Sequence, residues 1–154
     1  MSFDKNNLPW YTIDTFNMEK CVPSAFAGGT TNARGDNDGT SDPFTLYTVT
    51  GVVAAKLFGV CTVNLAGTGT VEVGTAISTA GLIAQTTGTD IDANEIWHDA
   101  TPDASIELLT VATTKIVTQN IIETIGTADI TSGNIYYVCL WRPLTPGSTV
   151  VSAV

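Results

Sequence analysis

An acidic run near residue 40 has the residue types and spacing that can bind a divalent cation. Asp36, Asp38 and Asp42 supply carboxylates at its first, third and seventh positions, and Gly39 permits a sharp turn between them. Calcium is bound by oxygen ligands gathered in this way, although the glutamate of an EF-hand loop is replaced by Tyr47. The simpler interpretation is an acidic turn held by side-chain hydrogen bonds, and a calcium site at these three aspartates is the alternative.

The sequence contains one histidine, His98, so any Ser-His-Asp arrangement would have to use it. No Gly-x-Ser-x-Gly motif accompanies His98. The acidic residues around it could in principle hold the carboxylate pair of a glycoside hydrolase: Asp90, Asp92, Glu95, Asp99 and Asp103. Acidic residues in a turn-rich segment are more commonly solvated, and no glycine-rich phosphate-binding loop is present. We therefore expect a protein that is not an enzyme.

Two other sets of residues could recognise a partner. Arg34, Gly35 and Asp36 form a tripeptide that some cell-surface receptors bind, although a match of three residues in a glycine-rich loop is most simply chance. Four aromatic residues could form a platform for stacking sugars or docking a protein, or could belong to the core: Trp97, Tyr136, Tyr137 and Trp141.

Composition and charge exclude several classes of function. The chain has 154 residues, of which 44% are hydrophobic, and this is enough for one folded domain. With 15 acidic and 6 basic residues and no basic run, nucleic acid is a poor partner. We also expect neither a signal peptide nor a membrane-spanning segment, because no apolar run reaches roughly 18 residues.

The three cysteines, Cys21, Cys61 and Cys139, have spacings that match neither a zinc site nor a disulfide framework. We interpret them as small buried hydrophobic residues in a reducing compartment. A Cys61–Cys139 bridge between strands is the alternative.

The elements that position these residues are predicted to be β-strands, because threonine is abundant and 14 glycines can supply tight turns. From Tyr47 to Leu65 every odd position is apolar or glycine, which is the period of a strand. The run is longer than a typical strand. We therefore predict bends or bulges at Gly51 and Gly59, where the chain would pass from one sheet to another.

Further strands are predicted at short intervals, over residues 70–76, 82–87, 105–111, 115–125 and 134–142. The segment 115–125 also has a helical spacing, and as a strand it would need a bulge near Gln119 and Asn120. Residues 134–142 are apolar on both faces, which favours a central strand that ends at Pro143. The expected fold is all-β, an antiparallel β-sandwich or barrel over residues 44–154.

Residues 1–43 lack sustained periodicity and are expected to form an extended N-terminal arm and an acidic loop. Trp10, Tyr11 and Phe16 are the aromatic groups that could anchor this arm. They are our candidates for docking to a partner, since extended arms commonly bind along a neighbour's sheet edge.

Three stretches in the second half of the chain resemble small structural proteins of tailed-bacteriophage virions: Thr89–Pro102, Ile125–Asn134 and Tyr136–Leu144. Within that group the chain is most similar to capsid decoration (cement) or auxiliary head proteins. The resemblance covers about residues 70–154 and does not include residues 1–43. It assigns no function residue by residue, because such proteins have no catalytic motif.

The resemblance implies a β-rich protein on the outer surface of the capsid, assembled into the virion in the host cytoplasm. The expected partners are the major capsid protein and further copies of the chain, as a homotrimer, with no nucleic acid, no membrane and no cofactor besides the possible calcium. The alternative is a receptor- or carbohydrate-binding module of a virion fibre.

Overall fold

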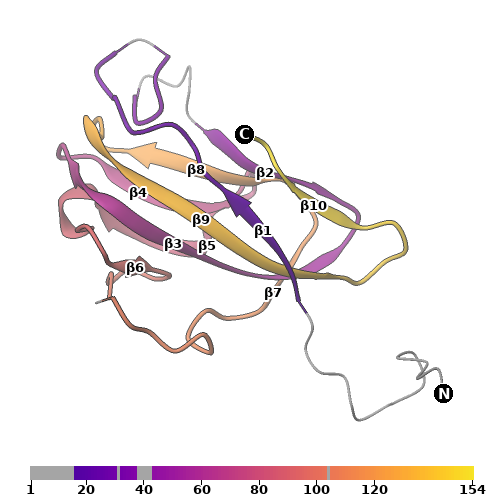
Figure 1. Cartoon of the computed structure of the whole chain (residues 1–154). Helices are drawn as coiled ribbons and strands as arrows, with labels where there is room; N and C mark the ends of the chain where they lie inside the picture. The colour runs from indigo at the N-terminus through magenta and orange to yellow at the C-terminus, as the bar shows by residue number, and fades with distance from the viewer. Residues whose placement is uncertain (1–15, 31, 38–42, 104) are drawn as a thin grey trace.

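The computed structural model describes residues 16–30, 32–37, 43–103 and 105–154. These residues form ten β-strands and one short 3-10 turn, η1 (Gly88–Asp90), and they include no α-helix. The strands make two antiparallel sheets that pack face to face, as Figure 1 shows. The predicted all-β class and the sandwich are therefore confirmed.

Sheet A has the strand order β1-β9-β3-β6, and β7 also pairs with β3. Its strands are β1 (Asn17–Cys21), β9 (Ser132–Pro143), β3 (Val53–Ala66), β6 (Ile96–Trp97) and β7 (Lys115–Val117). Because β9 lies between β1 and β3, the predicted central strand over residues 134–142 is confirmed, as is its end at Pro143.

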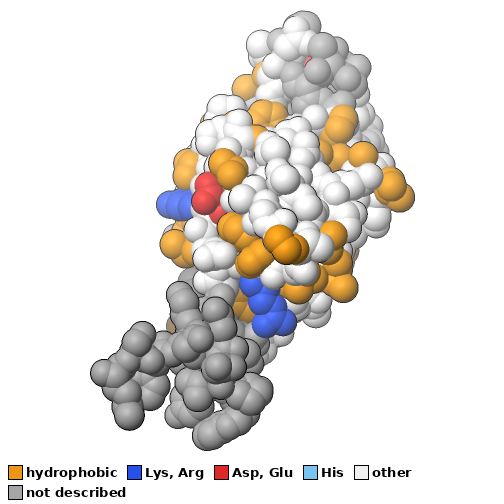
Figure 2. Space-filling model, turned by 90° about the vertical axis from the view of Figure 1, so that its right-hand side faces the viewer, with side chains coloured by type: hydrophobic (Ala, Val, Ile, Leu, Met, Phe, Trp, Pro, Cys, Tyr) orange, Lys and Arg blue, Asp and Glu red, His pale blue; other side chains and the backbone are white. Residues whose placement is uncertain are grey.

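Sheet B has the strand order β10-β2-β8-β4-β5. Its strands are β10 (Thr149–Ser152), β2 (Phe44–Thr50), β8 (Ile121–Gly126), β4 (Thr70–Thr75) and β5 (Ser78–Thr87). The predicted strands over residues 70–76 and 82–87 correspond to β4 and β5. Viewed from the side, in Figure 2, the sandwich carries small separate groups of hydrophobic side chains and few charged ones.

The long alternating run is divided at Gly51, where the chain passes from β2 in sheet B to β3 in sheet A. Gly51 has a φ of 72°, a value that glycine adopts readily, and a Cβ there would lie 2.5 Å from the hydroxyl oxygen of Ser148. The predicted change of sheet is confirmed at this residue. Gly59 was the wrong place for a second bend, because it lies in a continuous part of β3 and allows close packing, with Ile135 Cγ2 only 2.8 Å from where a Cβ would be.

The core fills the space between the sheets and draws on both. Alternate residues of β3 and β9 point into it, including Leu57, Cys61 and Tyr137. Cys21, Cys61 and Cys139 are all buried with free thiols, which confirms their interpretation as small core residues. Burial raises the pKa of the Cys61 thiol to about 11 and that of the Cys139 thiol to about 12, since it disfavours the thiolate.

Two predicted strands are corrected. Residues 105–111, apart from the turn at Leu108–Val111, follow an irregular course, because neither sheet offers them a partner strand. The segment 115–125 is two strands, β7 in sheet A and β8 in sheet B. Between them the chain leaves the ladder, and the Asn120 side-chain oxygen accepts the N–H of Val49 of β2 at 3.0 Å.

Residues on the N-terminal side of the boundary predicted at residue 43 contribute to the sandwich. Strand β1 is an edge strand of sheet A, and its five residues pair with β9 from Trp141 to Tyr137. Phe26 and Arg34 are buried against the sheets. The boundary itself follows residues 38–42, which lie outside the described part of the chain.

Candidate docking surface

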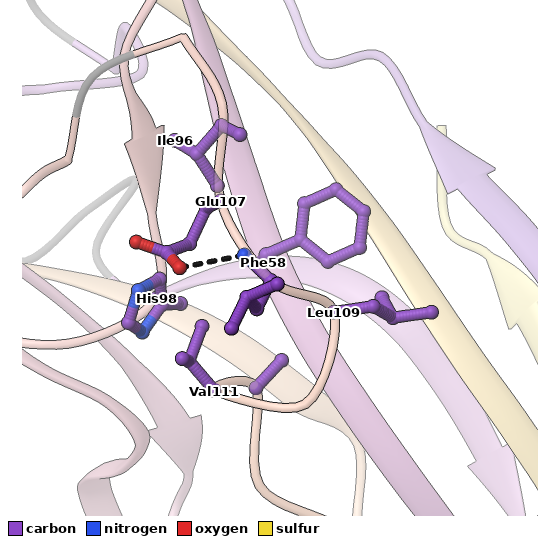
Figure 3. A pocket seen from close by; sticks show the side chains of 8 residues that line it. Phe58, Ile96, His98, Glu107, Leu109 and Val111 are labelled. Carbon is purple, nitrogen blue, oxygen red and sulfur yellow. Dashed lines mark hydrogen bonds between the residues drawn. The ribbon is translucent and has the colours of Figure 1, made fainter.

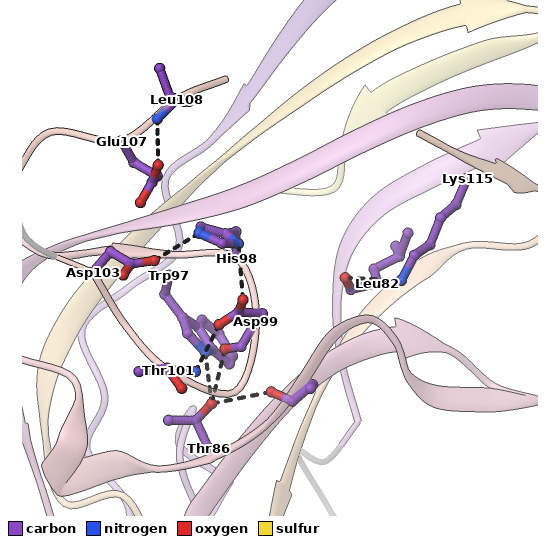
Figure 4. Close-up of polar contacts among 11 residues, drawn as sticks. Leu82, Thr86, Trp97, His98, Asp99, Thr101, Asp103, Glu107, Leu108 and Lys115 are labelled. Atoms are coloured by element: carbon purple, nitrogen blue, oxygen red, sulfur yellow. Dashed lines mark hydrogen bonds and ion pairs between the residues drawn. The ribbon is translucent and has the colours of Figure 1, made fainter. Parts of the chain in front are cut away.

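Strand β6 is fixed to the rest of the molecule by Trp97, whose side chain is fully buried between the sheets. The Trp97 indole N–H donates to the Thr86 hydroxyl of β5 at 2.9 Å, and this hydroxyl also lies 3.3 Å from the carbonyl oxygen of Asp99. Figure 4 shows these contacts converging on Thr86. One threonine of sheet B therefore anchors the segment that follows β6.

Because side chains alternate along a strand, Ile96 and His98 lie on the side opposite to Trp97, at the outer face of sheet A. There they line a cavity of about 80 Å³ together with Phe58 of β3 and residues of the following loop. Figure 3 shows Leu109 of this loop beside Phe58, and Glu107 and Val111 near His98. The cavity is mainly apolar and lies under residues 107–112.

The two ring nitrogens of His98 face two carboxylates. His98 Nε2 lies 2.8 Å from Asp103 Oδ2, and His98 Nδ1 lies 3.6 Å from Asp99 Oδ2. The His98 side chain is 6% exposed, whereas Asp103 and Asp99 are 37% and 57% exposed. In this arrangement neither nitrogen is directed at a hydroxyl, as a Ser-His-Asp mechanism would require.

The apolar loop, which we define as residues 105–112, carries the most conspicuous exposed hydrophobic side chains near this site. Ile106 is 88% exposed, Leu108 70% and Leu109 56%. A group of large apolar side chains in water is typical of a surface that docks to another macromolecule. Acidic residues flank the group, with Asp99 and Asp103 before it and Glu107 within it.

Sequence reasoning missed the apolar loop because it placed residues 105–111 in a strand with a buried face. One signal could have found it: Leu108 and Leu109 are adjacent, which interrupts the alternation that a half-buried strand requires. Ala112 is the one residue of the loop that is buried, and it closes the loop against the cavity.

Of the predicted calcium ligands, the structure describes Asp36, which is buried. Asp38 and Asp42 lie outside the described residues, so the calcium site at Asp36, Asp38 and Asp42 stays a prediction. Arg34 and Asp36 are both buried, and the tripeptide that they begin and end is therefore unavailable to a cell-surface receptor.

The predicted docking aromatics are only partly visible, because Trp10 and Tyr11 lie outside the described residues. Phe16 is half-buried, with Lys56 Nζ 5.6 Å and Arg142 Cζ 5.5 Å from the centre of its ring. The aromatic platform is not formed as a unit. Trp97 and Tyr137 are fully buried and cannot stack on a sugar.

A buried ion pair was also missed by sequence reasoning. The Arg34 guanidinium donates to both carboxylate oxygens of Glu123, at 2.8 and 2.6 Å, and the Tyr137 hydroxyl donates to Glu123 at 2.5 Å. Arg34 also donates to the carbonyl oxygen of Ser24 at 2.7 Å and lies over the Phe26 ring at 3.8 Å.

Electrostatics keep the Arg34 guanidinium charged and the Tyr137 hydroxyl neutral. Burial alone would lower the pKa of Arg34, but Glu123 raises it above its ordinary value, so the guanidinium stays charged. Burial, together with the negative charge of Glu123, raises the pKa of Tyr137. The network ties residues 24–34 to β8 and β9, and its partners are satisfied within the chain.

Among the described residues, no helix has the length and apolar character needed to cross a membrane. No protein-family model matches the chain, and comparison with curated proteins and with solved structures found no match.

Proposed function

We propose that the chain is a capsid decoration protein of a tailed bacteriophage. It binds the major capsid protein on the outer surface of the head, as a homotrimer, and stabilises the shell without catalysing a reaction. The observation that carries this proposal is the exposed apolar loop on the β-sandwich. The resemblance of residues 70–154 to virion proteins of this class supports it.

The apolar loop supplies the driving force for docking. Fully burying an exposed Ile or Leu side chain contributes about 1.5–3 kcal/mol before the costs of association are counted. Ile106, Leu108 and Leu109 together could therefore act as the central contact of a small interface. Because the loop is attached to two sheets that pack around one core, ordering the rest of the domain is already accomplished by folding, which favours association with a preformed lattice.

Charge supports a location outside the shell. The net charge of −9 repels DNA phosphates, so contact with the packaged genome is disfavoured. Asp99, Asp103 and Glu107 surround the apolar side chains with negative charge. The complementary surface on the capsid protein would therefore present an apolar recess with lysine or arginine at its rim.

The test is co-sedimentation of the full chain with purified capsid shells that lack it. The double variant Ile106→Ser/Leu108→Ser should lose binding by at least about tenfold, because two central apolar contacts are removed. The matched control is Ile77→Ser, which removes a side chain that is 84% exposed in the turn between β4 and β5. Equal binding by both variants and the natural chain would overturn the proposal.

Deletion of residues 1–15 tests the arm separately. It removes Trp10 and Tyr11 and keeps β1, Phe16 and the Arg34–Glu123 pair. If the arm contributes to docking, the shortened chain binds shells more weakly while its unfolding transition is unchanged. Full affinity of the shortened chain would assign docking to the sandwich alone.

The alternative of a receptor- or carbohydrate-binding fibre module is weakened because two of its four aromatic residues, Trp97 and Tyr137, are buried in the core, while Tyr136 and Trp141 are half-buried. Copy number in the particle distinguishes the two. A decoration protein occurs in a fixed ratio to the major capsid protein, whereas a fibre module occurs in far fewer copies.

A further inference from the structure

We propose that His98, Asp99 and Asp103 form a binding site for a first-row transition-metal ion, with Zn²⁺ as the representative ligand. One donor atom from each of the three residues lies within 4.8 Å of the other two. The shortest of these contacts joins the His98 ring to Asp103 at 2.8 Å. The inference concerns the isolated chain and does not depend on capsid binding.

The spacing is close to that of a coordination sphere. Zinc binds histidine nitrogen and carboxylate oxygen at about 2.1 Å, so two of its ligands are about 3.0–3.4 Å apart at common angles and at most about 4.2 Å apart. His98 Nε2 lies 2.8 Å from Asp103 Oδ2 and His98 Nδ1 lies 3.6 Å from Asp99 Oδ2, so the two carboxylates approach different nitrogens of the ring. An ion held by one of these nitrogens would bind the nearer carboxylate directly, and the donor atom of the other carboxylate, which lies within 4.8 Å, would have to move toward the ion.

The segment that holds the three side chains is fixed before any ion binds. Ile96 and Asp103 exchange two backbone hydrogen bonds, both 2.9 Å long, which close the segment into a loop. Inside this loop Trp97 is anchored to Thr86, and the Asp99 side chain accepts the N–H of Thr101 at 2.8 Å. A site that is organised in advance loses less entropy when the metal enters.

The donor set selects the kind of ion. One imidazole nitrogen with two carboxylate oxygens suits zinc and its neighbours in the first transition row. Calcium and magnesium take oxygen ligands, and calcium takes six to eight of them, so an imidazole nitrogen does not suit either ion. Asp99 and Asp103 are partly open to water, which gives the ion an entry path and leaves coordination positions for water.

The test is titration calorimetry of the full chain with zinc chloride near pH 7, and with calcium chloride as the comparison. The natural chain should bind one Zn²⁺ per chain at this cluster, and an excess of calcium should not displace it. His98→Gln and Asp103→Asn should each weaken zinc binding by at least about tenfold. Asp92→Asn is the matched control, because Asp92 is an exposed acid of the same segment outside the cluster.

Thermal unfolding gives a second readout. Zinc should raise the melting temperature of the natural chain and of Asp92→Asn, because a ligand that binds the folded state stabilises it. Asp99→Asn, at a largely exposed position, keeps the test valid if His98→Gln does not fold. No saturable zinc binding by the natural chain would overturn the proposal, as would unchanged zinc binding in Asp99→Asn and Asp103→Asn. Variants that are less stable with no dependence on zinc would show that the three residues form an ion pair only.

Discussion

The Arg34–Glu123 pair places charged side chains in the core, whereas the apolar loop at residues 105–112 places hydrophobic side chains in water. Arg34 and Glu123 are charged side chains with no exposure to solvent. Ile106, Leu108 and Leu109 are large hydrophobic side chains that are more than half exposed. Burying the charged pair costs desolvation free energy on folding, whereas the exposed apolar side chains gain none of the free energy that their burial would release.

The buried pair is compensated within the chain. The Arg34 guanidinium has Glu123, the Ser24 carbonyl and the Phe26 ring, and Glu123 has the Tyr137 hydroxyl in addition. In the apolar loop, Leu108 and Leu109 line the small cavity beneath the loop on one side and are exposed on the other. Because the buried charges are compensated by partners within the chain, their role is structural. The apolar side chains that stay in water indicate a contact with a partner.

The largest expected effect comes from breaking the buried pair. Glu123→Ala leaves the Arg34 charge without its partner in the core, and we expect the free energy of unfolding to fall by about 3–5 kcal/mol. Urea denaturation followed by tryptophan fluorescence measures the change. Glu72→Ala on the neighbouring strand β4, where the carboxylate is only partly buried, is the control and should cost much less. Equal losses in the two variants would contradict a special role for the pair.

A smaller loss of stability is expected on substitution of Thr86, the buried residue that anchors β6 beside the apolar loop. Thr86→Val keeps the volume but leaves the Trp97 indole N–H without its acceptor, at a cost of about 1–3 kcal/mol. Because Thr86 anchors β6, the variant should also increase hydrogen exchange at Ile96 and Asp103. Thr87→Val, one residue further on and less buried, is the control. A stability equal to that of the natural chain would show that the bond to Trp97 contributes nothing.

Alkaline pH tests the other buried ionisable groups. The folded-state pKa values of Cys61 and Cys139 are raised by burial from 9.0 to about 11 and about 12. Their contribution to stability is therefore fully present below pH 9 and is lost as the pH rises toward 11 and 12, because the unfolded chain ionises first. Each thiol can lower stability by up to about 1.4 kcal/mol per pH unit in that window.

The measurement is urea denaturation at a series of pH values from 7 to 11 with a reductant present. Cys139→Ala should be less stable than the natural chain at pH 7, since a core side chain is shortened, but its stability should fall less steeply above pH 9. Parallel curves for the two proteins would mean that the Cys139 thiol ionises equally in the folded and unfolded states.

The sequence predicted the sheets better than the surface. The alternation from Tyr47 to Leu65 found β3 and the passage between sheets at Gly51, since a buried face imposes a period of two on the residues. It could not separate β7 from β8, because the apolar residues of both strands face one core. The break between them depends on Asn120 bonding to Val49, a contact between residues far apart in sequence.

The buried ion pair was outside the reach of sequence patterns. Arg34 and Glu123 are far apart in the sequence, and neither residue lies in a motif that predicts their pairing. The cluster at His98 was predicted in part, since His98 and the neighbouring acidic residues are candidate catalytic residues by their types and spacing. Which of those acids lie close to the His98 ring depends on the loop that the backbone hydrogen bonds between Ile96 and Asp103 close. The sequence does not predict these bonds.

The smallest expected effect on stability, and the sharpest test of the comparison, is at the apolar loop. Ile106→Ser and Leu109→Ser remove apolar surface that is largely exposed in the free chain, so each should change the free energy of unfolding by less than about 0.5 kcal/mol. Urea denaturation of the single variants beside Leu57→Ala, a buried position of β3, gives the contrast. If the loop variants unfolded as readily as Leu57→Ala, Ile106 and Leu109 would be part of this chain's own core. A neutral result combined with weaker binding to shells would assign their apolar surface to a partner.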